Sequence, residues 1–150
     1  MDYLQRYQQW LNDTAVDNET KEELLALQGN DEELKDRFYQ ELAFGTAGLR
    51  GKLGAGSNRM NSYIVARATH AFAKVISSYG KDFKQRGVAI SHDYRIKSDE
   101  FAKIAACTFA AHNIPVYLYE SLRSTPQLSF TVRHLHCAGG INIPASHNPK

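Results

Sequence analysis

Two short apolar segments separated by a helical pattern constrain the fold of this chain more than any other feature. Residues 87–91 (GVAIS) and 114–119 each have the length of a buried strand. Between them, a helical pattern begins at Ser98, and Asn113 can end the helix. A strand, a helix and a second strand in this order predict a right-handed βαβ unit, in which the two strands are parallel.

The segments on either side extend the same alternation. A helix that Asn61 and Ser62 can cap is predicted to reach about Tyr79, another helix is predicted from Ser124, and a third strand at 139–143. We therefore expect an α/β fold, with helices on both faces of a mostly parallel sheet. The predicted buried face of the first helix consists of Val65, Ala68, Phe72, Val75, Ile76 and Tyr79. That of the helix after Ser98 consists of Phe101, Ile104, Ala105, Thr108 and Phe109, and Cys107 is expected to be a small core residue.

Residues 1–40 show only short helical patterns and no catalytic grouping. An apolar stripe at helical spacing is followed by a helix from about Glu19 to Leu27, which stops at Gly29. Asn30 is expected to cap a third helix. The stripe consists of Tyr3, Leu4, Tyr7, Trp10 and Leu11. We interpret residues 1–40 as a helical N-terminal extension, and residues 41–150 as an α/β domain that is incomplete at its C-terminus.

Composition excludes several classes of function. The net charge of +2 is small and no Lys/Arg run concentrates it, which argues against a nucleic-acid partner. No apolar run approaches the roughly 20 residues needed to span a bilayer, and the N-terminus lacks a signal-peptide core. Two cysteines do not make a disulfide framework. Together these features predict a cytoplasmic protein without a membrane partner.

Residues 44–58 are unusually rich in glycine. Five glycines fall within thirteen residues of this stretch, which implies special backbone angles or the close approach of another group. A flexible loop and a loop that closes on a phosphate fit equally well; in the second case Arg50 and Lys52 would supply positive charge. The stretch is not a Walker loop, because Gly-Lys-Ser/Thr is absent.

The predicted strand at 139–143 leads directly into a second candidate loop, Pro144-Ala145-Ser146-His147-Asn148-Pro149. In open α/β sheets, ligands bind at the loops that follow the carboxyl ends of strands. A serine beside a histidine can act as a nucleophile, although an isolated pair of this kind is more often part of a polar turn. Neighbouring residues on extended backbone also point to opposite sides, so a direct bond between Ser146 and His147 does not follow.

Several motifs together resemble one enzyme family. Ala-Ser-His-Asn-Pro at 145–149 resembles the phosphoserine loop of the α-D-phosphohexomutases, and Phe44–Gly51 resembles their N-terminal loop. Three further matches lie in the expected order: Gly56–Asn61, Asp93-Tyr94-Arg95 and Thr125-Pro126. The resemblance covers the whole chain and is strongest to the phosphoglucomutase/phosphopentomutase branch.

The resemblance implies a mechanism and a set of roles. Ser146 would carry the phosphoryl group and exchange it with a sugar monophosphate such as glucose 1-phosphate, through a sugar bisphosphate that also primes the enzyme. His147 would be its catalytic neighbour, while Arg50 and Asn148 would contact phosphate, and Lys52 is included for its charge and its place in the loop. Mg²⁺ would bind Ser146 through its phosphate. Asp93 and Arg95 are interpreted as a structural pair.

The chain also departs from the family pattern. Pro144 replaces a usual threonine, and Asn142 stands where an apolar strand residue is common. No Asp-x-Asp-x-Asp metal loop occurs in these residues, and the further domains that the resemblance implies are absent. We therefore expect the 150-residue chain to be inactive alone and its parent to be the enzyme.

Three alternatives stay open at this stage. The first is a non-enzymatic domain of the same fold that binds a phosphosugar or a protein. The second is a serine hydrolase, although Gly-x-Ser-x-Gly is absent. The third is a zinc site at His134, His136 and Cys137, for which no fourth ligand is indicated.

Overall fold

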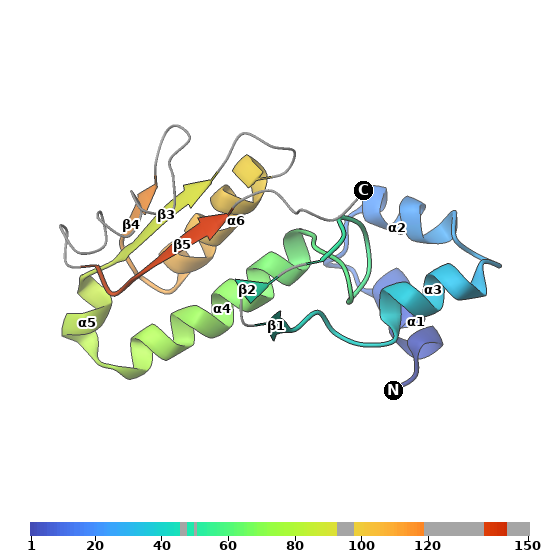
Figure 1. The fold of residues 1–150 in the computed structure, drawn as a ribbon, viewed down its shortest axis with the longest axis horizontal. Coiled ribbons are helices and arrows are strands. Elements are labelled where there is room, and N and C mark those ends of the chain that lie inside the picture. Colours follow the sequence, from blue (N-terminus) through green and yellow to red (C-terminus); the bar gives the residue numbers. More distant parts are fainter. Residues whose placement is uncertain (46–47, 50, 93–97, 119–136, 144–150) are drawn as a thin grey trace. The chain divides into compact units, whose positions relative to one another are not determined.

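The computed structural model describes residues 1–45, 48–49, 51–92, 98–118 and 137–143. Their contacts divide them into two units, one reaching from Met1 to Ile64 and the other beginning at Val65. Figure 1 shows helices and the glycine-rich segment in the first unit, and helices with a small sheet in the second.

Three helices form most of the first unit: α1 (Tyr3–Asn12), α2 (Asn18–Leu25) and α3 (Asp31–Phe38). Each begins at a polar side chain that accepts a hydrogen bond from its first turn: Asp2 from the Gln5 N–H, Asp17 from Thr20 and Asn30 from Glu33. The three predicted helices are confirmed, although α2 ends two residues earlier than expected.

The core of the first unit is aromatic. Phe38 is fully buried, and the rings of Tyr7 and Trp10 each meet it edge to face at 5.8 Å. The remaining buried members of this cluster are Leu24, Leu34 and Ala55. Most of the predicted α1 stripe packs here, but Leu4 is 44% exposed.

The glycine-rich segment begins with a short antiparallel pair, β1 (Phe44–Gly45) and β2 (Gly48–Leu49). Phe44 pairs with Leu49, and Gly45 pairs with Gly48. The chain then forms a loop from Gly51 that leads into helix α4 (Ser62–Ser78). Part of the glycine-rich segment, for which a flexible loop was one of two interpretations, therefore forms paired strands.

The second unit contains a three-stranded parallel sheet in the order β4-β3-β5. Its strands are β3 (Val88–His92), β4 (Val116–Leu118) and β5 (Gly139–Ile143). Helix α6 (Ser98–Ala111) connects β3 to β4, and α5 (Lys81–Gln85) precedes β3. The predicted strand–helix–strand order and the α/β class with a parallel sheet are confirmed.

Both sides of β3 are buried. Val88 and Ile90 face one cluster, which includes Ala73 of α4 and Phe109 of α6. Ala89, on the opposite side of the strand, packs with Cys137. The helix expected to begin at Ser124 lies outside the described residues.

Two helix faces differ from the prediction. Val75 of α4 and Tyr79, which directly follows the helix, are 52% and 70% exposed, because the helix meets the sheet and α6 along a narrower stripe that includes Ala73 and Ile76. Cys107 is exposed, contrary to the expectation of a core residue. It lies two positions from the buried Ala105, so a helix of 3.6 residues per turn directs the two side chains to opposite sides.

Candidate functional site

Most of the predicted site residues lie outside the described part of the chain. This holds for Arg50, Ser146, His147 and Asn148. It also holds for Asp93, Arg95, Thr125, Pro126 and Pro144. Lys52 is described, and its side chain is exposed. The structure therefore describes segments that adjoin these residues in the sequence, and the assigned roles stay predictions.

The sheet determines where the Ser146 loop begins. β5 ends at Ile143, which is paired in register with His92, the last residue of β3. Two neighbouring parallel strands thus end side by side, three residues before Ser146. This carboxyl edge is where ligands bind in open α/β sheets.

His92 was not among the predicted site residues. Its side chain is only 12% exposed, and its Nε2 lies 3.9 Å from the Asp99 carboxylate in the first turn of α6. The signal that could have identified it is a histidine as the last residue of a buried strand. It places an imidazole at the same sheet edge as the start of the serine loop.

The loop after β2 is fixed to Lys52 through its backbone. The Met60 N–H donates to the Lys52 carbonyl at 2.7 Å, and the Gly54 N–H donates to the Met60 carbonyl at 3.2 Å. These bonds hold the backbone at Lys52, which follows Arg50 by two residues in the sequence.

The same loop is bound to the end of α3. The Asn58 N–H donates to the Arg37 carbonyl at 2.8 Å, and the Asn58 side chain donates to the Asp36 carbonyl at 2.9 Å. Ser57 is buried and donates its hydroxyl proton to the Gln40 carbonyl. The Ser57 hydroxyl is thus occupied by a backbone carbonyl, whereas Thr46 lies outside the described residues.

An ionic network accompanies these backbone bonds. Arg59, with a side chain only 5% exposed, donates to the Asp36 carboxylate at 2.6 Å and lies 3.5 Å from Glu33. Arg37 pairs with Glu33 at 2.9 Å and with Glu23 at 2.7 Å. The hydrogen bond from Arg59 lowers the pKa of Asp36, and the charge of Lys52 contributes in the same direction. Both arginines therefore neutralise carboxylates of the helical segment.

Asn61 joins the loop to α4. Its amide nitrogen donates to the carbonyls of Gly54 and Gly56 at 2.9 and 3.0 Å. Its oxygen accepts from the Ile64 N–H at 3.0 Å, in the manner of a helix cap. The predicted cap is confirmed, and one side chain thus closes the glycine loop and starts the next helix.

The described residues contain no group of three or more His, Cys, Asp and Glu side chains that could hold a metal ion. Of the zinc alternative, His134 and His136 lie outside the described residues. Cys137 is buried, and burial raises its pKa, which disfavours the thiolate that a metal would need. No helix within the described ranges is long and apolar enough to cross a membrane.

Comparison with known proteins gives one consistent family. Phosphopentomutases from Mus musculus and Homo sapiens are each 41% identical over 150 residues, covering 95% of this chain and 24% of the relative. A phosphoglucomutase from Staphylococcus epidermidis is 44% identical over 119 residues, covering 79% of this chain and 21% of the relative. The chain therefore spans about a quarter of the length of the curated relatives it matches. No solved structure gives a significant match.

The family comparison covers the parallel sheet, its helices and the serine loop together. Residues 41–150 match phosphoglucomutase/phosphomannomutase, alpha/beta/alpha domain I. This is most of the chain, and the resemblance that the motifs indicated is confirmed. The chain belongs to the phosphoglucomutase/phosphomannomutase family.

Proposed function

We propose that this chain is the phosphoserine-bearing part of a sugar-phosphate mutase and that Ser146 carries the phosphoryl group. The pairing of Ile143 with His92 carries this proposal, because it starts the serine loop at the ligand-binding edge of a parallel sheet. The family membership supports the reaction class.

The proposed reaction has two phosphoryl transfers. First, the hydroxyl oxygen of a sugar monophosphate attacks phosphoserine 146; the new sugar O–P bond forms as the serine O–P bond breaks. The resulting sugar bisphosphate then returns its other phosphoryl group to the Ser146 oxygen. Such transfers depend mainly on positioning and charge neutralisation.

The residues of this chain would share that work. Arg50, Lys52 and Asn148 would bind phosphate oxygens, and His147 would handle the proton of the sugar hydroxyl. The network around Arg59 would hold the backbone near Lys52 and Arg50 in place before substrate arrives. It would act by positioning, because Arg59 itself is occupied by Asp36.

Mg²⁺ and a sugar bisphosphate primer belong to the proposal as expectations of the resemblance. The phosphate of Ser146 is the one metal ligand that the resemblance assigns to this chain, since the described residues hold no cluster of carboxylates. Bound there, Mg²⁺ would neutralise phosphate charge. The isolated chain is proposed to be inactive, because it spans about a quarter of its relatives' length.

The proposed substrates are glucose 1-phosphate and glucose 6-phosphate, or a pair of pentose phosphates. Relatives named phosphoglucomutase and phosphopentomutase are about equally similar, so both sugars belong in the assay. We propose a cytoplasmic location, where the two free cysteines would stay reduced.

The test is turnover by the longer protein that contains this chain, with both sugar pairs, Mg²⁺ and the matching bisphosphate. Ser146→Ala should abolish turnover, whereas Ser78→Ala, at an exposed serine near the end of α4, should leave it unchanged. Absence of turnover on either sugar, or full turnover by Ser146→Ala, would refute the proposal. Phosphosugar binding without turnover would favour the non-enzymatic alternative.

A further inference from the structure

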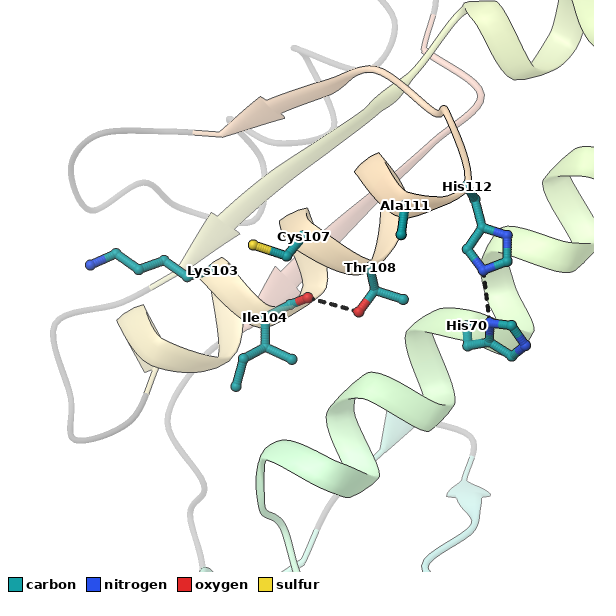
Figure 2. Close-up of a pocket in the computed structure, with 7 residues that line it drawn as sticks. All are labelled: His70, Lys103, Ile104, Cys107, Thr108, Ala111 and His112. Atoms are coloured by element: carbon teal, nitrogen blue, oxygen red, sulfur yellow. Dashed lines mark hydrogen bonds between the residues drawn. The ribbon is translucent and has the colours of Figure 1, made fainter. Parts of the chain in front are cut away.

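A shallow pocket of about 430 Å³ lies between α4 and α6 in the second unit. Its lining is mostly apolar side chain, but two histidines meet at one end of it (Figure 2). The lining residues are His70, Lys103, Ile104, Cys107, Thr108, Ala111 and His112. His70 comes from the middle of α4, and His112 directly follows α6.

The two imidazoles point at each other. His70 Nδ1 lies 2.7 Å from His112 Nε2, with ring centroids 4.7 Å apart and planes inclined by 48°. At this distance one proton is shared between the two facing nitrogens, so one nitrogen donates and the other presents its lone pair. When the donor ring carries its proton on its other nitrogen instead, both facing nitrogens present lone pairs to the same region, and no proton leaves the pair.

The backbone under the pair is firmly packed. Phe72, two residues after His70, meets the ring of Phe109, three residues before His112, at 5.8 Å. Ala73 and Phe109 are fully buried in the core of this unit. The separation of the two imidazoles is therefore set by the core, while His70 itself is exposed and free to turn its ring.

The other polar groups of the pocket are engaged or directed elsewhere. Lys103 pairs with Asp99 at 3.1 Å, and Thr108 donates its hydroxyl proton to the Ile104 carbonyl at 2.8 Å. In Figure 2 the sulfur of Cys107 points away from the two imidazoles. The chemistry of this end of the pocket is thus that of two facing imidazole rings.

Imidazole pairs bind divalent transition metals, whereas Mg²⁺ and Ca²⁺ prefer oxygen ligands. With metal–nitrogen bonds of about 2.05 Å, two ligands at a right angle have nitrogens about 2.9 Å apart, and tetrahedral ligands about 3.3 Å apart. The observed 2.7 Å is a hydrogen-bond length, and a turn of the exposed His70 ring brings either spacing within reach. Affinity for nitrogen ligands rises along the first-row divalent metals to Ni(II) and Cu(II), so these two ions fit an imidazole pair best.

We propose that His70 and His112 form a two-histidine site for one tetragonal transition-metal ion, Ni(II) or Cu(II). The donor ring moves its proton to its outer nitrogen, each ring turns its freed nitrogen toward the ion, and water completes the coordination, since no third ligand of the described residues joins the pair. The bound ion links α4 to α6 across the pocket. This site is separate from the proposed phosphoryl chemistry and does not depend on it.

The test is calorimetric titration of the tag-free 150-residue chain with NiCl₂, together with thermal unfolding in its presence. Ni(II) avoids the thiol oxidation that Cu(II) would cause at the exposed Cys107. We expect one ion per chain and a higher unfolding temperature with metal. Removing a residue that only hydrogen-bonds to a metal ligand already lowers metal affinity about 10–100-fold. Because His70→Gln and His112→Gln each remove a direct ligand, each should weaken binding at least about tenfold.

The double variant His134→Gln/His136→Gln is the matched control, because it removes two histidines of the zinc alternative and should leave nickel binding unchanged. Circular dichroism of each variant without metal verifies that it is folded. Absence of binding by the unmodified chain would overturn the proposal. Full affinity in either single variant, or loss of binding in the control alone, would also overturn it, because the ion would then bind elsewhere.

Discussion

Gly56 shows how closely the glycine loop approaches α3. Its φ is +128°, and a Cβ built there lies 2.9 Å from the Arg37 carbonyl oxygen, a backbone atom that cannot move away without shifting the helix. Gly29 also has a positive φ, of +89°, but nothing lies within 4 Å of its Cβ position. Substitutions at the two glycines can therefore distinguish the cost of a strained backbone angle from the cost of a close contact.

We predict that Gly29→Ala lowers the free energy of unfolding by about 1–2 kcal/mol, the cost of a left-handed residue with a Cβ. Gly56→Ala adds an unrelieved contact and should cost about 2–5 kcal/mol. Urea unfolding followed by the fluorescence of Trp10, the single tryptophan, measures both in the first unit. Equal effects of the two substitutions would contradict the close approach to Arg37.

Arg59 is the most deeply buried cation of the network, and we predict that Arg59→Met lowers the free energy of unfolding by about 1–3 kcal/mol. Its loss leaves the carboxylate of Asp36 without its shortest partner. Lys35→Met makes the same change of charge at an exposed position of α3 and should stay within about 0.5 kcal/mol of the unmodified chain. Urea unfolding monitored at Trp10 compares them, and similar losses for both would mean that the network contributes little.

The ion pair between Arg59 and Asp36 also predicts how the free energy of unfolding changes at acid pH. The pKa of Asp36 is lowered from 3.8, so its pairing stabilises the fold above that value and is lost as pH falls through the lower, folded-state pKa. Because the carboxylate is about half exposed, the effect should be modest, below about 1 kcal/mol. The free energy of unfolding should therefore fall more between about pH 4 and 2 in the unmodified chain than in Asp36→Asn. A stronger acid dependence in Asp36→Asn would reverse the sign and contradict the assignment.

At the scale of elements, Asn61 connects the glycine loop to α4 through both ends of its amide. Asn61→Ala removes the cap and the loop bonds together and should cost about 1–2 kcal/mol. Asn61→Asp keeps the oxygen that accepts from Ile64 and loses only the donor, so its cost should be smaller. Thermal unfolding of the two variants tests this order; a loss in Asn61→Asp as large as that in Asn61→Ala would contradict a contribution from the cap.

The elements themselves could largely be predicted from local patterns. The strand at 139–143 has the predicted bounds, and β3 differs from the predicted 87–91 by one residue at each end, because short apolar runs between turn residues leave little choice. The helix cap at Asn30 could be predicted in the same way, because this residue is followed directly by three acidic residues. Periodicity and capping chemistry are contained in a few neighbouring residues, which explains the agreement.

Contacts between elements could not be predicted in the same way. The apolar pattern of α4 is wider than the stripe that the sheet and α6 cover, so it did not predict that Val75 and Tyr79 are exposed. The binding of residues 54–61 to α3 through Arg37 and Arg59 depends on partners about 20 positions apart in sequence, which no periodicity reports. The pairing of His70 with His112 is more distant still, at 42 positions.

For the whole molecule, the two units divide the proposed work. The first holds the glycine loop and Lys52 against the helical segment, and the sheet of the second leads to the serine loop. Residues 1–40 were interpreted as a helical N-terminal extension, and the domain match begins at residue 41. In the structure, the loop of residues 54–61 shares a unit with α1, α2 and α3 and is bonded to α3. We therefore expect the helical segment to be needed for a well-ordered glycine loop.

The central claim is that Ser146 is the residue that carries the phosphoryl group. The direct measurement is peptide mass spectrometry of the longer protein that contains this chain, after incubation with the sugar bisphosphate and again after addition of excess sugar monophosphate. We predict one phosphoryl group on Ser146 after the first step, none on Thr46 or Ser57, and its turnover in the second. Phosphate on another residue, or an active enzyme with Ser146 never phosphorylated, would contradict the account.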